Sequence, residues 1–142
     1  MKLPIIFSLV LIFLTSTSSC NKNRRHPVPS IPFDISININ LPSYSNLTGV
    51  GGYAYVQGGS KGIVVYRRST YEFVAFDRHS PANDGTCEDP LVTNDDNFLQ
   101  LDDLCTGATF SLYDGSPLSG SDFGLRMYVT VFDGNSDLRI YN

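Results

Sequence analysis

The sequence predicts an all-β domain, and three observations support this prediction. Hydrophobic and polar residues alternate from Phe33 to Asn40, which is the period of two expected of a strand with one solvated face. Short runs of β-branched and aromatic residues then recur between glycine-rich or polar turns. No segment carries apolar residues at helical spacing over a useful length. The chain is therefore expected to form an antiparallel sandwich or a small barrel.

The expected strands follow one another with short connections. Residues 41–52 (LPSYSNLTGVGG) form a predicted loop after the first strand. The later strands are predicted at residues 53–56, 63–66, 71–76, 109–113, 126–132 and 137–141. Asp133-Gly134-Asn135 would join the last two strands as a closing hairpin.

Length and charge limit the class of protein. With 142 residues, of which 42% are hydrophobic and 17% charged, the chain suits one globular domain with one core. Ten Lys and Arg residues stand against fourteen Asp and Glu residues, and four of the basic residues precede Pro27. The part after Pro27 therefore carries six basic residues against all fourteen acids, and this negative balance argues against a nucleic-acid partner, which needs a basic face.

The first nineteen residues are predicted to be a signal peptide. Lys2 gives a positive start, and residues 3–14 (LPIIFSLVLIFL) form an apolar run that is too short to span a bilayer comfortably. Small residues at 15–19 then lead to Cys20. These features predict export into the cell envelope.

Cys20 is a candidate lipidation site. The sequence TSSC resembles a bacterial lipobox, although Thr17 stands where that consensus prefers Leu. The resemblance implies that Cys20 is acylated and anchors the chain to the membrane without spanning it. The alternative is an ordinary signal peptide that leaves Cys20 as a thiol, which is a liability in an oxidising compartment.

Residues 20–32 are predicted to form a flexible basic tether. The segment has no apolar periodicity, and its prolines favour extended backbone. Lys22, Arg24 and Arg25 could each add about 1 kcal/mol of attraction to anionic headgroups. The alternative is a linker that only spaces the domain from the membrane. Surface-exported lipoproteins of some Gram-negative groups carry acidic residues here, so the basic residues favour a periplasm-facing protein.

Two polar loops carry a resemblance to a known family. The first is FDRHSPANDGTC at residues 76–87, and the second lies within LDDLCTGATFSLYDGSPLSG at residues 101–120. They resemble the loops A-[FY]-D-x-x-C-P-H and C-P-x-H-G-x-x-F of Rieske iron–sulfur domains. The matching residues are Ala75, Phe76, Asp77, Gly107, Phe110, Asp114, Gly115, Pro117 and Gly120. The resemblance covers most of residues 51–142 and implies a Rieske-like antiparallel β-sandwich or small barrel over residues 33–142.

The same alignment replaces all four cluster ligands. The ligand positions fall on Ser80, Ala82, Asp103 and Thr106. A Rieske centre needs two thiolates and two imidazoles, and the methyl group of alanine cannot bind iron at all. The family's shielding G-P-A loop is also replaced, by residues 120–122 (GSD). The resemblance therefore implies a degenerate member with no cofactor.

An alternative keeps an electron-transfer function. Residues 20–142 contain Cys87, Cys105, His26 and His79, which would supply a [2Fe-2S] cluster with two ligands of each kind only in a rearranged site. His79 with Asp103 could instead hold a single transition metal. Acids around the loops could bind calcium, although their spacing fits no calcium-loop pattern. These acids are Asp77, Asp84, Glu88, Asp89, Asp95, Asp96, Asp102 and Asp103.

Cys87 and Cys105 are predicted to form a disulfide that joins the two loops. In the Rieske proteins of quinol-oxidising complexes a disulfide joins the loops from such positions. An oxidising compartment and two thiols remaining after acylation favour the same pairing. The alternative is a pair of free thiols.

No catalytic constellation is present, so the protein is not expected to be an enzyme. Ser80 follows His79 directly, but neighbours in sequence rarely point at each other, and no G-x-S-x-G motif occurs. A structural or interaction role with an envelope protein partner is expected instead. Aromatic residues could contribute a partner surface or pack within the sheet. They are Tyr53, Tyr55, Tyr66 and Tyr71.

Overall fold

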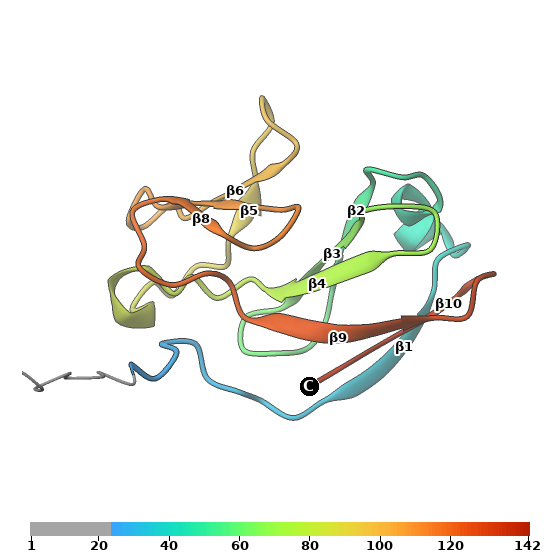
Figure 1. Ribbon diagram of the computed structural model, residues 1–142, viewed down its shortest axis with the longest axis horizontal. Helices are drawn as coiled ribbons and strands as arrows, with labels where there is room; N and C mark the ends of the chain where they lie inside the picture. The colour runs from blue at the N-terminus through green and yellow to red at the C-terminus, as the bar shows by residue number, and fades with distance from the viewer. Residues whose placement is uncertain (1–23) are drawn as a thin grey trace, which may run out of the picture.

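The computed structural model describes residues 24–142 and confirms an all-β fold (Figure 1). The predicted signal peptide and Cys20 lie outside the described residues. The elements in chain order are β1 (Asp34–Asn38), η1 (Pro42–Thr48), β2 (Tyr53–Val56), β3 (Ile63–Arg67), β4 (Phe73–Asp77), η2 (Ala82–Gly85), β5 (Val92–Thr93), β6 (Gln100–Asp102), β7 (Thr109–Ser111), β8 (Pro117–Ser119), β9 (Met127–Phe132) and β10 (Asp137–Tyr141).

The strands form two antiparallel sheets. The large sheet has the order β1-β10-β9-β4-β3-β2, and the small sheet has the order β5-β6-β7-β8. Only two residue pairs join β4 to β9, so the large sheet can curl at this point. Figure 1 shows the small sheet at the upper left, displaced from the body of the large one.

Two hydrophobic clusters lie on opposite faces of the central strands. Ile63 and Val65 of β3 face a cluster inside the curl of the large sheet, whereas Val64 and Tyr66 face a cluster beneath the small sheet. β4 is also buried along its whole length. Strands buried on both faces lose the alternation of hydrophobic and polar residues, which explains the continuous apolar runs in this part of the sequence.

The sequence missed the shortest elements. The predicted loop at 41–52 contains η1, whose Leu47 is fully buried under the large sheet. β5, β6 and β8 are only two or three residues long and were not predicted. Such short strands show no usable periodicity, and they form because their partners align them.

The described part of the predicted tether, residues 24–32, packs on the domain. Val28 is fully buried, and its carbonyl oxygen accepts hydrogen bonds from Nε and Nη2 of Arg126 at 3.0 and 2.6 Å. Nε2 of His26 lies 2.9 Å from the carbonyl oxygen of Gly124. Residues 24–32 therefore lie against the domain, and the sequence shows no sign of this because their partners lie about a hundred residues away in the chain.

Candidate functional site

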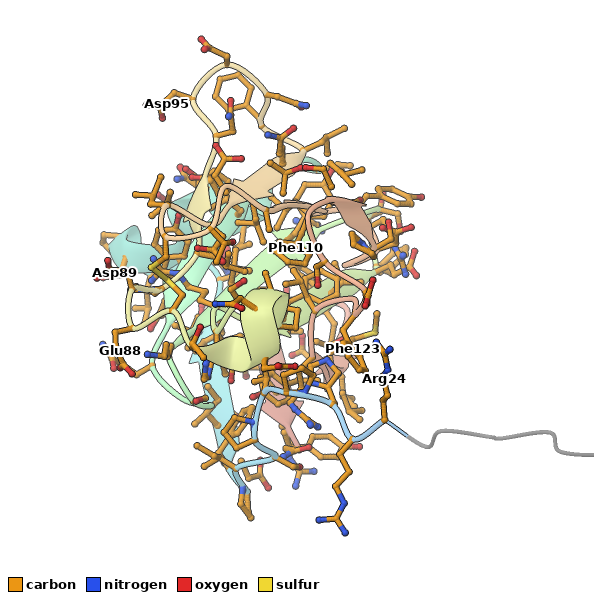
Figure 2. The ribbon with its side chains drawn as sticks, turned by 90° about the vertical axis from the view of Figure 1, so that its left-hand side faces the viewer. Arg24, Glu88, Asp89, Asp95, Phe110 and Phe123 are labelled. Carbon is orange, nitrogen blue, oxygen red and sulfur yellow. A yellow bond between two sulfur atoms is a disulfide. The ribbon has the colours of Figure 1, made fainter. Side chains whose placement is uncertain are left out.

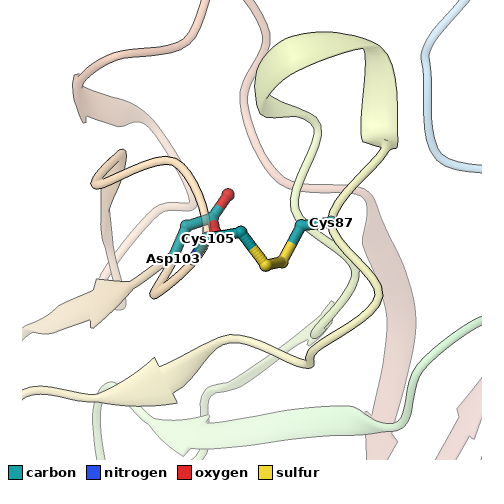
Figure 3. A group of neighbouring side chains, drawn as sticks. All are labelled: Cys87, Asp103 and Cys105. Atoms are coloured by element: carbon teal, nitrogen blue, oxygen red, sulfur yellow. A yellow bond between two sulfur atoms is a disulfide. The ribbon is translucent and has the colours of Figure 1, made fainter.

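Two loops meet beside the small sheet and are covalently joined. The first loop, residues 78–91, connects β4 to β5, and the second loop, residues 103–108, connects β6 to β7. A disulfide joins Cys87 to Cys105 with their Cα atoms 5.8 Å apart (Figure 3). Cys87 is buried and Cys105 is exposed. The predicted pairing is confirmed, and the alternative of two free thiols is not observed.

The four positions aligned with cluster ligands belong to one hydrogen-bond network. The Asp103 carboxylate accepts hydrogen bonds from the Thr106 hydroxyl at 2.7 Å, from the backbone N–H of Cys105 at 2.9 Å and from that of Thr106 at 3.2 Å. The Ser80 hydroxyl is a further side-chain partner of this carboxylate. The backbone N–H of Ala82 in turn lies 3.2 Å from the Ser80 oxygen. Ser80, Ala82 and Asp103 are almost fully buried.

The Asp103 carboxylate is held in its charged form. Burial by itself raises the pKa of Asp103, but hydrogen bonds from Ser80, Thr106 and the backbone N–H of Cys105 outweigh it and lower the pKa overall. These donors satisfy the carboxylate within the protein. The four side chains offer no thiolate and no imidazole, so they do not fit an ordinary Rieske cluster.

His79 is turned away from this network. Its Nδ1 lies 2.8 Å from the Ser60 hydroxyl, and its Nε2 lies 2.8 Å from the carbonyl oxygen of Gly85. A carbonyl oxygen only accepts, so Nε2 carries a proton, and in the neutral ring Nδ1 accepts from the Ser60 hydroxyl. Both ring nitrogens are therefore engaged, and His79 neither pairs with Asp103 nor activates Ser80.

Asp77 is a fully buried acid, which in the sequence stood out only as a motif match and as one of the acids near the loops. One of its carboxylate oxygens accepts hydrogen bonds from the Ser60 N–H at 2.6 Å and the Tyr128 hydroxyl at 2.5 Å. The other accepts from the N–H groups of His79 and Lys61 at 2.8 and 3.2 Å. Burial, followed by the hydrogen bond to Asp77, raises the pKa of Tyr128. The sequence signal that points to this role is an acid at the end of an apolar strand. A buried acid needs hydrogen-bond donors from within the protein.

A glycine-containing turn supplies backbone N–H donors to the Asp77 carboxylate. Residues 57–62 (QGGSKG) connect β2 to β3, and Gly59 has φ +62°. A Cβ atom on Gly59 would stand 2.4 Å from the Asp77 carboxylate and 2.6 Å from the Tyr128 hydroxyl. Only glycine fits at this position. The turn thus directs its N–H groups to the end of β4, where the first loop begins.

The remaining acidic residues do not converge. Figure 2 places Asp95 at the tip of a projecting loop, apart from Glu88 and Asp89. Glu88 forms an ion pair with Lys61 at 2.9 Å. Oδ2 of Asp89 lies 3.9 Å from Sγ of Cys105. Within residues 24–142, the one group of three side chains with metal-ligand geometry is Cys87, Asp103 and Cys105.

The surface around the loops holds two open, polar hollows. The larger, about 860 Å³, lies between the N-terminal segment, η2 and the chain near Phe123, where Arg24 pairs with Asp122 at 2.9 Å (Figure 2). The other, about 590 Å³, lies over the glycine turn and Arg78. Two of the cationic side chains that line these hollows already have partners. Arg24 pairs with Asp122, and the guanidinium carbon of Arg78 lies 3.7 Å from the centre of the Tyr55 ring.

The four tyrosines suggested as a partner surface divide between core and surface. Tyr66 is buried beneath the small sheet, and Tyr53 packs partly against the same cluster. Tyr55 is partly covered by Arg78, while Tyr71 is 72% exposed. They therefore do not form one surface.

Comparison with known proteins gives no family for this chain. No protein-family model matches it, and no curated protein sequence matches it either. In residues 24–142, no helix has the length and apolar character needed to cross a membrane.

Proposed function

We propose that this protein is a lipid-anchored lipoprotein of the bacterial cell envelope, facing the periplasm. Its Rieske-like domain has lost the iron–sulfur cluster and serves as a structural or interaction module. The disulfide that joins the two loops supports the proposed relationship, because the resemblance implied this pairing. Cys20 supplies the anchor.

The observation that carries the proposal is the network around Asp103. Its carboxylate takes hydrogen bonds from Ser80 and Thr106, which occupy two of the four aligned ligand positions. Ala82 fills a third with a buried methyl group. The positions that would face a cluster therefore stabilise one another, and the loops need no metal to hold their conformation.

Exposed apolar side chains on either side of β6 support an interaction role. Phe98 precedes β6 and is 66% exposed, and Leu104 follows β6 and is 71% exposed. Asp95 and Asp96 lie beside Phe98 in the chain. Exposed apolar side chains with carboxylates beside them in the chain suit a partner with an apolar, basic surface.

The loss of the cluster is tested on the full chain, purified without oxygen from a bacterial host that assembles iron–sulfur clusters. The expected result is a folded, colourless protein without stoichiometric iron. Near-stoichiometric iron together with visible absorption would contradict the proposal. That result would favour the alternative, a Rieske-type electron-transfer protein with an atypical ligand set.

The anchor is tested by labelling cells with a fatty acid that carries a chemical handle. The intact chain is expected to take up the label and to sediment with membranes. Cys20→Ala should lose the label, whereas Cys105→Ser should keep it. An unlabelled intact chain in the soluble periplasm would instead indicate an ordinary signal peptide.

The interaction role is tested by placing a photo-crosslinking side chain at single positions in living cells. Position 98 or 104 should give a discrete crosslinked species in the envelope. Position 71 is equally exposed but lies on the β3–β4 connection, so it serves as the matched control. Equal crosslinking at all three positions would argue against a specific contact at the ends of β6.

A further inference from the structure

Three potential metal ligands converge at the disulfide. The sulfur atoms of Cys87 and Cys105 and a carboxylate oxygen of Asp103 all lie within 4.8 Å of one another. Figure 3 shows the Asp103 side chain directly beside the disulfide. The three residues come from both loops, so the tertiary structure creates the group. While the disulfide is intact, neither sulfur is a thiolate.

We propose that reduction of the Cys87–Cys105 disulfide converts this group into a zinc site. A dithiol reductant supplies two electrons and two protons, so the S–S bond breaks, two thiols form and the reductant becomes a disulfide. Zinc then binds both sulfurs and Asp103, and the two thiols release their protons. A covalent bond joins the two loops in the oxidised protein, and the metal joins them in the reduced protein.

A tetrahedral zinc ion requires a definite spacing of its ligand atoms, which reduction of the disulfide makes accessible. With Zn–S near 2.3 Å and Zn–O near 2.1 Å, the ligand atoms must lie roughly 3.4–3.8 Å apart. The sulfurs have to separate from their bonded position, and the Cα distance of 5.8 Å leaves room for this by rotation of the side chains. Cys105 is exposed, so a reductant can reach its sulfur and the side chain can turn.

Asp103 is held in place for this role. The N–H groups of Cys105 and Thr106 bind its Oδ1, which fixes the carboxylate as supporting hydrogen bonds fix ligands in metal sites. The Thr106 hydroxyl binds Oδ2, and Thr106 is exposed. That hydroxyl can turn to water, which opens one position on the carboxylate for the metal while Ser80 and the backbone N–H groups stay as donors.

The surroundings favour a divalent cation. Asp89 Oδ2, 3.9 Å from the Cys105 sulfur, can complete the coordination, as can a water molecule. Two thiolates select zinc over calcium or magnesium, which prefer oxygen ligands. His79 plays no part, because both of its ring nitrogens already have partners.

The experiment compares the full chain in its oxidised form and after anaerobic reduction with a phosphine. Zinc is titrated against a chromophoric chelator, and Co²⁺ is used as a spectroscopic probe. The reduced protein should bind one equivalent and give a thiolate-to-cobalt absorption band, and the oxidised protein should do neither. Cys87→Ser/Cys105→Ser should not bind in either state, which also controls for Cys20.

Asp103→Asn tests the third ligand. It should weaken zinc binding at least about tenfold, while Asp95→Asn, at the distant loop tip, should leave it unchanged. Equal affinity in the wild type and Asp103→Asn would overturn the assignment, as would a reduced wild type that binds no zinc. If Asp103→Asn does not fold, X-ray absorption spectroscopy of the zinc-loaded wild type identifies the atoms that bind the zinc. Two sulfur neighbours with oxygen support the site, and any other number of sulfurs overturns it.

Discussion

The large sheet and the loop region with the small sheet are stabilised in different ways. The large sheet has strands of four to six residues around a cluster of buried aliphatic and aromatic side chains. The small sheet has strands of two or three residues, and a disulfide and the Asp103 network hold the loops that flank it. Short strands bury too little apolar area to order themselves. The region that carries the candidate site therefore depends on specific polar and covalent links.

The largest effect on this comparison is expected from the buried aromatic side chain of the small sheet. Phe110 on β7 is fully buried in the cluster between the two sheets. Phe110→Ala should lower the free energy of unfolding by about 4 kcal/mol, through lost burial and the cavity that remains. Hydrogen exchange should accelerate in β5–β8 more than in β9 and β10.

The matched control for this variant is Phe98→Ala. Phe98 is also aromatic and belongs to the same region, but it is exposed, so this substitution should change the free energy of unfolding little. Uniform acceleration of exchange throughout the protein in Phe110→Ala would mean that the two regions unfold together.

The disulfide is expected to have the next largest effect. Cys87→Ser/Cys105→Ser removes a covalent link between residues 18 apart, which should cost about 3 kcal/mol. Urea unfolding measures the change. Exchange should increase mainly at residues 78–91 and 103–108. A loss below about 1 kcal/mol would show that the polar network alone is sufficient to hold the loops.

The effect of Asp103→Asn on the free energy of unfolding is expected to depend on pH, and this dependence tests how the loop region is stabilised. The pKa of Asp103 is lowered in the folded protein, so its ionised form stabilises the fold above the unfolded pKa near 3.9, and that stability is lost as the pH falls through the folded value. Asp103→Asn should cost about 2 kcal/mol at pH 7. The difference from the wild type should shrink below about pH 4.

Chemical unfolding measured across the acidic range checks this dependence. Asp95→Asn removes the same charge from the exposed loop tip and should leave the free energy of unfolding at pH 7 nearly unchanged. A constant difference between the wild type and Asp103→Asn at all pH values would contradict the role given to the charge.

The smallest expected effect concerns the link between the two regions. Tyr128 on β9 donates to Asp77 at the start of the first loop. Tyr128→Phe removes this hydrogen bond but leaves three backbone donors on Asp77, so it should cost about 1.5 kcal/mol. Thermal unfolding should show the loss, and Tyr71→Phe on the surface should show none. A loss of stability larger than that of the disulfide variant would mean that this hydrogen bond contributes more than the disulfide.

The sequence was most informative where side chains alternate. The strand at 33–40, the hairpin at 126–141 and the strands at 53–56 and 63–66 were predicted close to their observed bounds. The Cys87–Cys105 pairing was also predicted, because the compartment and the family resemblance agreed. A period of two and a pair of cysteines are both visible without knowledge of distant contacts.

The sequence by itself thus determined the fold class, the order of the main strands and the two polar loops. The tertiary structure decided the small sheet, the cradle around Asp77, the network around Asp103 and the packing of Val28 on Arg126. The physical reason is the range of the interactions. Alternation along a strand is local, whereas the donors to Asp77 come partly from Tyr128, fifty-one residues away, and become neighbours only when the sheets assemble.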